Sequence, residues 1–132
     1  MNSPRALNSP AEARPAFRLK WAPDAGLKEA LGGDEESIAE LVDAFTTDTA
    51  ARLQRMRAAL LAGDGTRLRN EAHTIKGSSR QVGAGALGDV CQQVELAPAP
   101  TTLPEFSSLV ELAQERFSEI AAAMADYCAC RR

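Results

Sequence analysis

The sequence predicts an all-α protein, built as an antiparallel four-helix bundle with a short extra N-terminal helix. In four long segments, apolar residues recur at three- and four-residue steps, which is the spacing of one helix face. Alanine and leucine dominate the apolar residues, aromatic residues make up only 5%, and no segment alternates as a strand does. Because the connections are short, consecutive helices should run antiparallel. A length of 132 residues suits one domain.

The first 24 residues are predicted to be a flexible tail or linker, and residues 25–130 to be the folded domain. Four prolines prevent a regular helix in the tail: Pro4, Pro10, Pro15 and Pro23. Phe17, Leu19 and Trp21 alternate along its last part. This pattern leaves two possibilities open, namely that the stretch docks on the domain or that it is extended with incidental apolar residues.

Glycine, proline and capping residues divide the domain into five predicted helices. Gly32 and Gly33 end the short first helix, and Asp34 is suited to cap the N-terminus of the second. Pro104 is well placed in the first turn of the last helix. The predicted helices cover residues 25–31, 35–62, 66–80, about 87–97, and 104 onward.

Composition and charge exclude several classes of function. The net charge of −3 gives no support for a nucleic-acid or membrane surface, and no apolar run is long enough to span a membrane. The three cysteines contain no C-x-x-C pair, and the single histidine cannot complete a Cys/His zinc set. We therefore expect no metal or other cofactor in this chain, and a reducing, cytoplasmic setting.

The predicted helix over residues 66–80 differs from the other long helices in its outward face. At about 100° per residue, one face collects the apolar and small residues Leu68, Ala72, Ile75 and Ser79. His73 points roughly 140° away from Leu68 by the same helical pitch. Its helix neighbours at i−4, i+3 and i+7 are all cations: Arg69, Lys76 and Arg80. Gly77 also faces outward, although an internal glycine costs on the order of 1 kcal/mol relative to alanine.

This outward face suits phosphoryl chemistry. A neutral imidazole is a good nucleophile towards phosphorus and titrates near neutral pH. Neighbouring cations would hold phosphoryl oxygens and would disfavour the imidazolium form. The bare backbone at Gly77 would let another protein approach His73. Glu71 lies on a different face of the helix, so no carboxylate is an obvious general base.

The residues alone also allow a protein of a different class, a helical interaction module in which His73 is an incidental surface residue. The two possibilities differ in whether the chain takes up acid-labile, alkali-stable phosphate. A hydrolase or metalloprotein is disfavoured, because the sequence has no second histidine, no Ser-His-Asp order and no clustered carboxylates facing His73.

One run of residues resembles the motif of the histidine-containing phosphotransfer (HPt) domains of two-component phosphorelays. The run is Ala72-His73-Thr74-Ile75-Lys76-Gly77-Ser78-Ser79, followed by Val82-Gly83-Ala84. The turns around Gly32 and Gly63 also resemble the family, so the likeness covers about residues 25–128. It implies that His73 is phosphorylated on Nε2, that Lys76 neutralises the phosphoryl oxygens, and that Gly77 leaves room for the partner.

The resemblance gives weaker indications for the other residues of this face. It implies that Gln81 orients the imidazole or its surroundings. Arg80 departs from the small residue often found at its position, and with Arg69 it would add positive charge to the site or narrow the choice of partner.

The resemblance further implies a phosphoryl carrier rather than an enzyme. The partners would be receiver domains of response regulators or of a hybrid sensor kinase, each with a phosphorylatable aspartate and its own bound Mg²⁺. Family members lack an ATP site, and no glycine-rich phosphate loop is present here. We expect a monomer. The sequence leaves open a free-standing shuttle or the last domain of a hybrid kinase, while the end of the chain at Arg132 disfavours an N-terminal chemotaxis-kinase-type domain.

Overall fold

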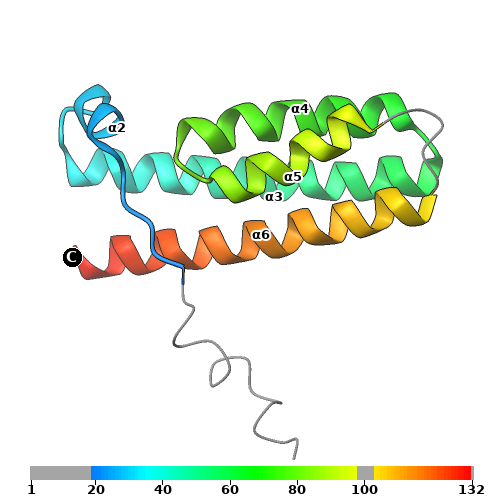
Figure 1. The fold of residues 1–132 in the computed structure, drawn as a ribbon. Helices are drawn as coiled ribbons and strands as arrows, with labels where there is room; N and C mark the ends of the chain where they lie inside the picture. Colours follow the sequence, from blue (N-terminus) through cyan, green and yellow to red (C-terminus); the bar gives the residue numbers. More distant parts are fainter. Residues whose placement is uncertain (1–18, 98–102, 132) are drawn as a thin grey trace, which may run out of the picture.

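The computed structural model describes residues 19–97 and 103–131, and this part of the chain is helical without strands (Figure 1). Its helices are α2 (Ala25–Ala30), α3 (Glu35–Ala62), α4 (Gly65–Gln81), α5 (Gly85–Leu96) and α6 (Leu103–Cys130). The all-α prediction is therefore confirmed, and the predicted helix ends agree within about two residues where the chain is described. Residues 1–18 and 98–102, which include Phe17 and most of the predicted tail, lie outside the described residues.

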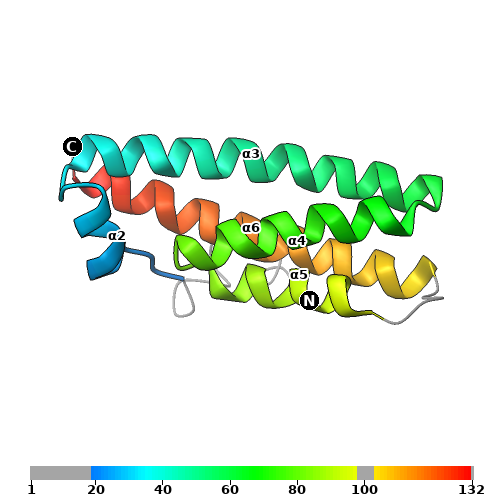
Figure 2. The same ribbon diagram turned by 90° about the horizontal axis from the view of Figure 1, so that it is seen from above.

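The four long helices form the predicted antiparallel bundle. Helix α3 packs against α4 and α6, and α5 packs against the same two helices. Each helix runs opposite to the one before it, and the short α2 lies at the end of the bundle where α3 begins and α6 ends (Figures 1 and 2). None of the described helices is long and apolar enough to cross a membrane.

Local sequence signals set the helix ends that frame the candidate site. The Asp34 carboxylate accepts a hydrogen bond from the backbone N–H of Glu36 at 3.2 Å, which confirms it as the N-cap of α3. Gly63 ends α3 with a φ of 71°, a left-handed conformation that favours glycine. Asp64 then caps α4 by accepting from the N–H of Arg67. These two residues turn the chain back so that α4 lies along α3.

The core follows the apolar faces predicted for the helices. In α4 the buried residues are the four that the helical wheel placed together, Leu68, Ala72, Ile75 and Ser79. They pack with buried side chains of the other three long helices, including Leu53, Met56, Cys91, Val94, Ala113 and Met124. Burial raises the pKa of the Cys91 thiol to about 12, so this cysteine is protonated at neutral pH and fills the core. The inward face of α4 is thus fixed, and its outward face is fixed with it.

Of the two possibilities left open for the stretch before residue 24, docking on the domain describes Trp21 and Pro23, which are both buried. The Trp21 indole N–H donates to the carbonyl of Val82 at 2.7 Å, and its ring packs edge-on against Tyr127 with centroids 5.3 Å apart. A large aromatic ring with a satisfied N–H is stabilised by burial. The extended segment that precedes α2 therefore belongs to the core, while Leu19 is exposed.

We predict that Trp21→Ala lowers the free energy of unfolding by about 3–5 kcal/mol, as for other buried aromatic residues. Trp21→Phe should lower the free energy of unfolding by less than Trp21→Ala does. About 1 kcal/mol of this smaller loss should come from the missing hydrogen bond to the Val82 carbonyl. Urea denaturation measures both changes. Leu19→Ala is the matched control and should be nearly neutral; equal effects for Trp21→Ala and Leu19→Ala would contradict the packing described here.

Candidate functional site

The centre of the outward face of α4 is His73, whose side chain is 66% exposed. This agrees with the helical wheel, which pointed the imidazole away from the core. One turn further along, Gly77 is exposed, and a Cβ atom placed on it would have no neighbour within 4 Å. The backbone beside His73 is therefore open to a large partner from outside the bundle.

A carboxylate from the neighbouring helix joins the two principal residues of this face. Glu95 Oε2, on α5, lies 2.6 Å from His73 Nδ1, and Glu95 Oε1 lies 2.6 Å from Lys76 Nζ. Lys76 and Glu95 are mostly covered, with side-chain exposures of 21% and 24%. A single carboxylate thus fixes the imidazole and the ammonium group relative to each other across the seam between α4 and α5.

The charge of Glu95 determines which imidazole nitrogen carries the proton. The hydrogen bond from Lys76, followed by that from His73, holds the pKa of Glu95 below its ordinary value, so the group is ionised at neutral pH. An ionised carboxylate only accepts hydrogen bonds, so the shared proton lies on Nδ1. In the neutral imidazole this leaves a lone pair on Nε2, which is the nitrogen far from the backbone.

Arg69 and Arg80, which were predicted to add positive charge near His73, both contact the neighbouring helices. The Arg69 guanidinium donates to the Ala97 carbonyl at 3.1 Å and lies over the Phe106 ring at 5.2 Å, which ties α4 to the end of α5 and to α6. Arg80 Nη2 donates to Asp89 at 3.3 Å and to Gln92 at 2.8 Å, both on α5. Long side chains reach across the helix seam, a contact that the wheel of one helix does not contain.

Gln81 and Glu71 lie away from the imidazole. Gln81 is exposed in the last turn of α4, two turns beyond His73, and the imidazole's hydrogen bond within the described chain is with Glu95 instead. The role implied for Gln81 therefore has no contact to support it. Glu71 accepts hydrogen bonds from Arg52 and Arg55 of α3, so it faces α3 as its position on the wheel indicated.

The sequence prediction missed Glu95, although the sequence contains a signal for it. Helices α4 and α5 form an antiparallel pair joined by the turn at residues 82–84. His73 and Glu95 each lie 11 residues from Ala84, so equal rise per residue brings them to the same level of the pair. Arg80 and Gly88, four residues from Ala84 on either side, are level in the same way and in contact.

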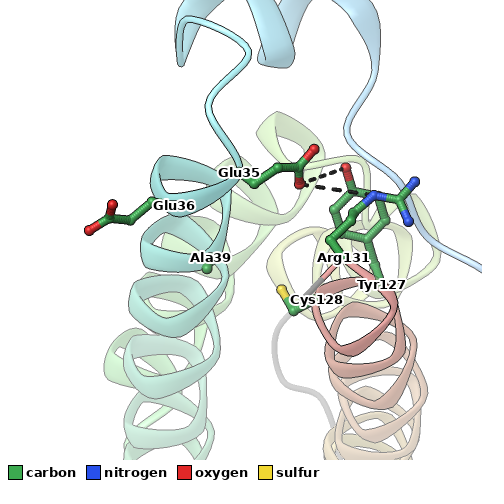
Figure 3. Close-up of a pocket in the computed structure, with 6 residues that line it drawn as sticks. All are labelled: Glu35, Glu36, Ala39, Tyr127, Cys128 and Arg131. Carbon is green, nitrogen blue, oxygen red and sulfur yellow. Dashed lines mark hydrogen bonds and ion pairs between the residues drawn. The ribbon is translucent and has the colours of Figure 1, made fainter.

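The described surface also has a hollow whose lining includes none of the residues that surround His73. A shallow hollow of about 190 Å³ lies where α3 begins and α6 ends, and Figure 3 shows its lining residues Glu35, Glu36, Ala39, Tyr127, Cys128 and Arg131. Glu35 accepts a long hydrogen bond of 3.5 Å from the Tyr127 hydroxyl, and it lies 3.9 Å from Arg131. Within residues 19–97 and 103–131, no group of three His, Cys, Asp or Glu side chains could hold a metal ion.

Comparisons with known proteins point to one family. The family model described as the Hpt domain matches residues 40–126, which is more than half of the chain. The crystal structure of histidine-containing phosphotransfer protein B (HptB) from Pseudomonas aeruginosa PAO1 matches with a TM-score of 0.73 and 30% sequence identity, covering 82% of this chain and 91% of that one. A comparison with curated proteins found no match.

The matched segment contains α4 and α5 entirely, and with them His73, Lys76, Gly77 and Glu95. The chain therefore belongs to the Hpt domain family, the histidine phosphotransfer domains of two-component phosphorelays.

Proposed function

We propose that His73 is the residue that carries the phosphoryl group, accepting it on Nε2 from the aspartyl phosphate of one receiver domain and passing it to another. The observation that carries this proposal is the pair of contacts made by Glu95, which leave an exposed imidazole with its proton on Nδ1. In the neutral form of this imidazole no proton has to leave the ring before Nε2 attacks, because that nitrogen already has its lone pair.

The transfer step balances on this chain without a general base. The Nε2 lone pair forms a bond to phosphorus while the bond from phosphorus to the aspartyl oxygen breaks, and the aspartate leaves as a carboxylate. The imidazole keeps its Nδ1 proton and becomes positively charged. Glu95 accepts the Nδ1–H hydrogen bond and offsets this charge, so it acts as a positioning residue for the imidazole.

Lys76 is the cation best placed to hold the phosphoryl oxygens. Its ammonium group and the imidazole share the Glu95 carboxylate, so both lie on the same side of the α4–α5 seam. An ammonium group is a compact point charge with three donors. It can keep one hydrogen bond to Glu95 while donating others to the phosphoryl group.

The partner of this chain is a protein, and Gly77 is the place where it comes closest. Since His73 stands on a convex helix and not in a pocket, the reacting phosphoryl group has to be carried to it by another surface. Receiver domains of response regulators or hybrid kinases are the family's partners. We propose that the chain acts as a monomer without a cofactor of its own, and that Mg²⁺ is held by the receiver.

The first test is phosphotransfer from a panel of phosphorylated receivers. Wild type should acquire acid-labile, alkali-stable phosphate, and His73→Gln should acquire none while keeping its helical circular dichroism and melting temperature, because the side chain is exposed. An interaction module with an incidental histidine would show no such label in wild type. Labelled His73→Gln would place the phosphoryl group elsewhere and contradict the assignment.

A second prediction follows from the lowered pKa of Glu95. Removing the larger cause with Lys76→Ala should raise this pKa towards its ordinary value, and His73→Ala should raise it less. A carboxyl group with a lowered folded-state pKa stabilises the fold above its unfolded pKa, and this contribution is lost as pH falls through the folded value. Carboxyl ¹³C NMR titration measures each pKa. A Glu95 pKa unchanged by Lys76→Ala would contradict the shared-carboxylate arrangement.

The third prediction separates stability from partner access at Gly77. Gly77→Ala should raise the free energy of unfolding by about 0.5–1 kcal/mol, because alanine is the better helix former and its Cβ meets no neighbour. Transfer from receivers should nevertheless become slower, while labelling by the small donor phosphoramidate stays within about twofold, since one extra methyl group obstructs only a close-packed protein surface. Unchanged transfer would show that no partner backbone approaches this position.

A further inference from the structure

We infer that Arg80 is a specificity-determining residue for the receiver partner, selecting receivers that present a carboxylate near their phosphorylated aspartate. The inference rests on the proposed function of His73. Its structural basis is the position of Arg80 on the same face of α4, seven residues after His73 and three after Gly77.

The helix spacing between Arg80 and His73 places Arg80 inside a partner footprint of ordinary size centred on the imidazole. Seven residues of helix correspond to a rise of about 10 Å and a rotation of about 20° from the His73 direction. An interface of ordinary size buries roughly 800 Å² on each partner, a patch with a radius of roughly 16 Å. Between the two residues lies the open backbone of Gly77.

The Arg80 side chain is held in a defined position along this face. Gly88 of α5 is buried, and a Cβ atom placed there would lie 3.1 Å from Arg80 Cγ, so the missing side chain makes room for the arginine stem. Beyond the stem, Nη2 bonds Gln92 and Asp89. A fixed guanidinium loses less side-chain entropy when it binds a partner than a freely moving one.

The charge of Arg80 remains available to a partner. Its side chain is 45% exposed, and the Asp89 carboxylate it meets at 3.3 Å is 72% exposed, so this ion pair is weak and easily exchanged. Both bonds described above come from Nη2, whereas a guanidinium has five N–H donors. Arg69 differs, because its charge is directed at the Ala97 carbonyl and the Phe106 ring.

An exposed cation at the rim of an interface acts on the choice of partner more than on total affinity. The helix rise between His73 and Arg80 is about 10 Å. A receiver with a carboxylate at about this distance from its phosphorylated aspartate gains an ion pair with Arg80. A receiver with a cation there is repelled. The chemistry at His73 is unaffected, because Glu95 and Lys76 surround it without a contribution from Arg80.

The experiment compares transfer rates from a panel of phosphorylated receivers with labelling by phosphoramidate, a small donor that has no docking surface. Arg80→Ala should slow transfer from the best receiver about three- to fivefold, the upper part of the range of one exposed ion pair, and Arg80→Glu should slow it about tenfold or more. For receivers that lack this carboxylate, Arg80→Ala should change the transfer rate by less than about twofold. The rate of labelling by phosphoramidate should also change by less than about twofold. Added salt should reduce the difference between wild type and Arg80→Ala.

Two variants serve as controls. Arg116→Ala removes an equal charge from α6, whose main contacts are with α3 and α5, and should leave the receiver ranking unchanged. Arg80→Lys keeps the charge and should restore most of the rate with the best receiver, even if it loosens the contact with Gln92. If Arg80→Ala lowers the melting temperature, the comparison of Arg80→Lys with wild type still tests the role of the charge.

The possible failures are distinguishable. If wild type takes phosphate neither from a receiver nor from phosphoramidate, the proposed function is wrong and this inference fails with it. If wild type is labelled but Arg80→Ala and Arg80→Glu rank the receivers as wild type does, only the inference is wrong. Equal slowing with every receiver and with phosphoramidate would show that Arg80 acts on His73 or on the fold, and would also overturn it.

Discussion

The contact on which the site depends is the carboxylate of Glu95, which His73 and Lys76 share. It joins α5 to α4, and it accepts the hydrogen bond that places the imidazole proton on Nδ1. Its two oxygens hold His73 and Lys76 at 2.6 Å each, so the imidazole orientation follows from the register of α4 against α5. That register is set elsewhere, by the turn at residues 82–84, by the buried Gly88 and by Trp21 bonded to the Val82 carbonyl. Packing distant from His73 therefore determines the state of its ring.

The exposure of His73 explains why this arrangement suits a carrier. Enzymes usually surround the reacting group with a pocket that excludes water, whereas this imidazole stands on a convex helix with open backbone beside it. The bundle places an exposed imidazole beside one ammonium group, with a single carboxylate between them. Under the proposed function the phosphoryl group arrives with the partner, which makes partner recognition part of the reaction.

Sequence periodicity predicted the faces of single helices well and the contacts between helices poorly. The four buried residues of α4 and the exposed His73 follow from one helical wheel, since burial on one side determines what faces water on the other. The wheel contains no second helix, so it could not show that Glu95 reaches His73. Nor could it show that Arg69 contacts residues of α5 and α6, or that one nitrogen of Arg80 bonds residues of α5. The sequence left open whether the stretch around Trp21 docks on the domain, because prolines exclude helix there but do not exclude burial. The extended segment is buried where its aromatic ring finds a hydrogen-bond acceptor.

If His73 carries the phosphoryl group as proposed, the Glu95 carboxylate that holds its imidazole would also limit how firmly that group is held. A phosphoryl group brings roughly −1.5 to −2 charges at neutral pH, and it would stand beside an ionised Glu95 with Lys76 shared between the two anions. Like charges at this range repel, while Glu95 offsets the positive charge on the ring. These opposing effects favour a phosphohistidine that forms readily and also leaves readily, which is what a reversible carrier between two aspartates requires. A neutral residue at position 95 would remove both effects, so attack and release are linked through one side chain.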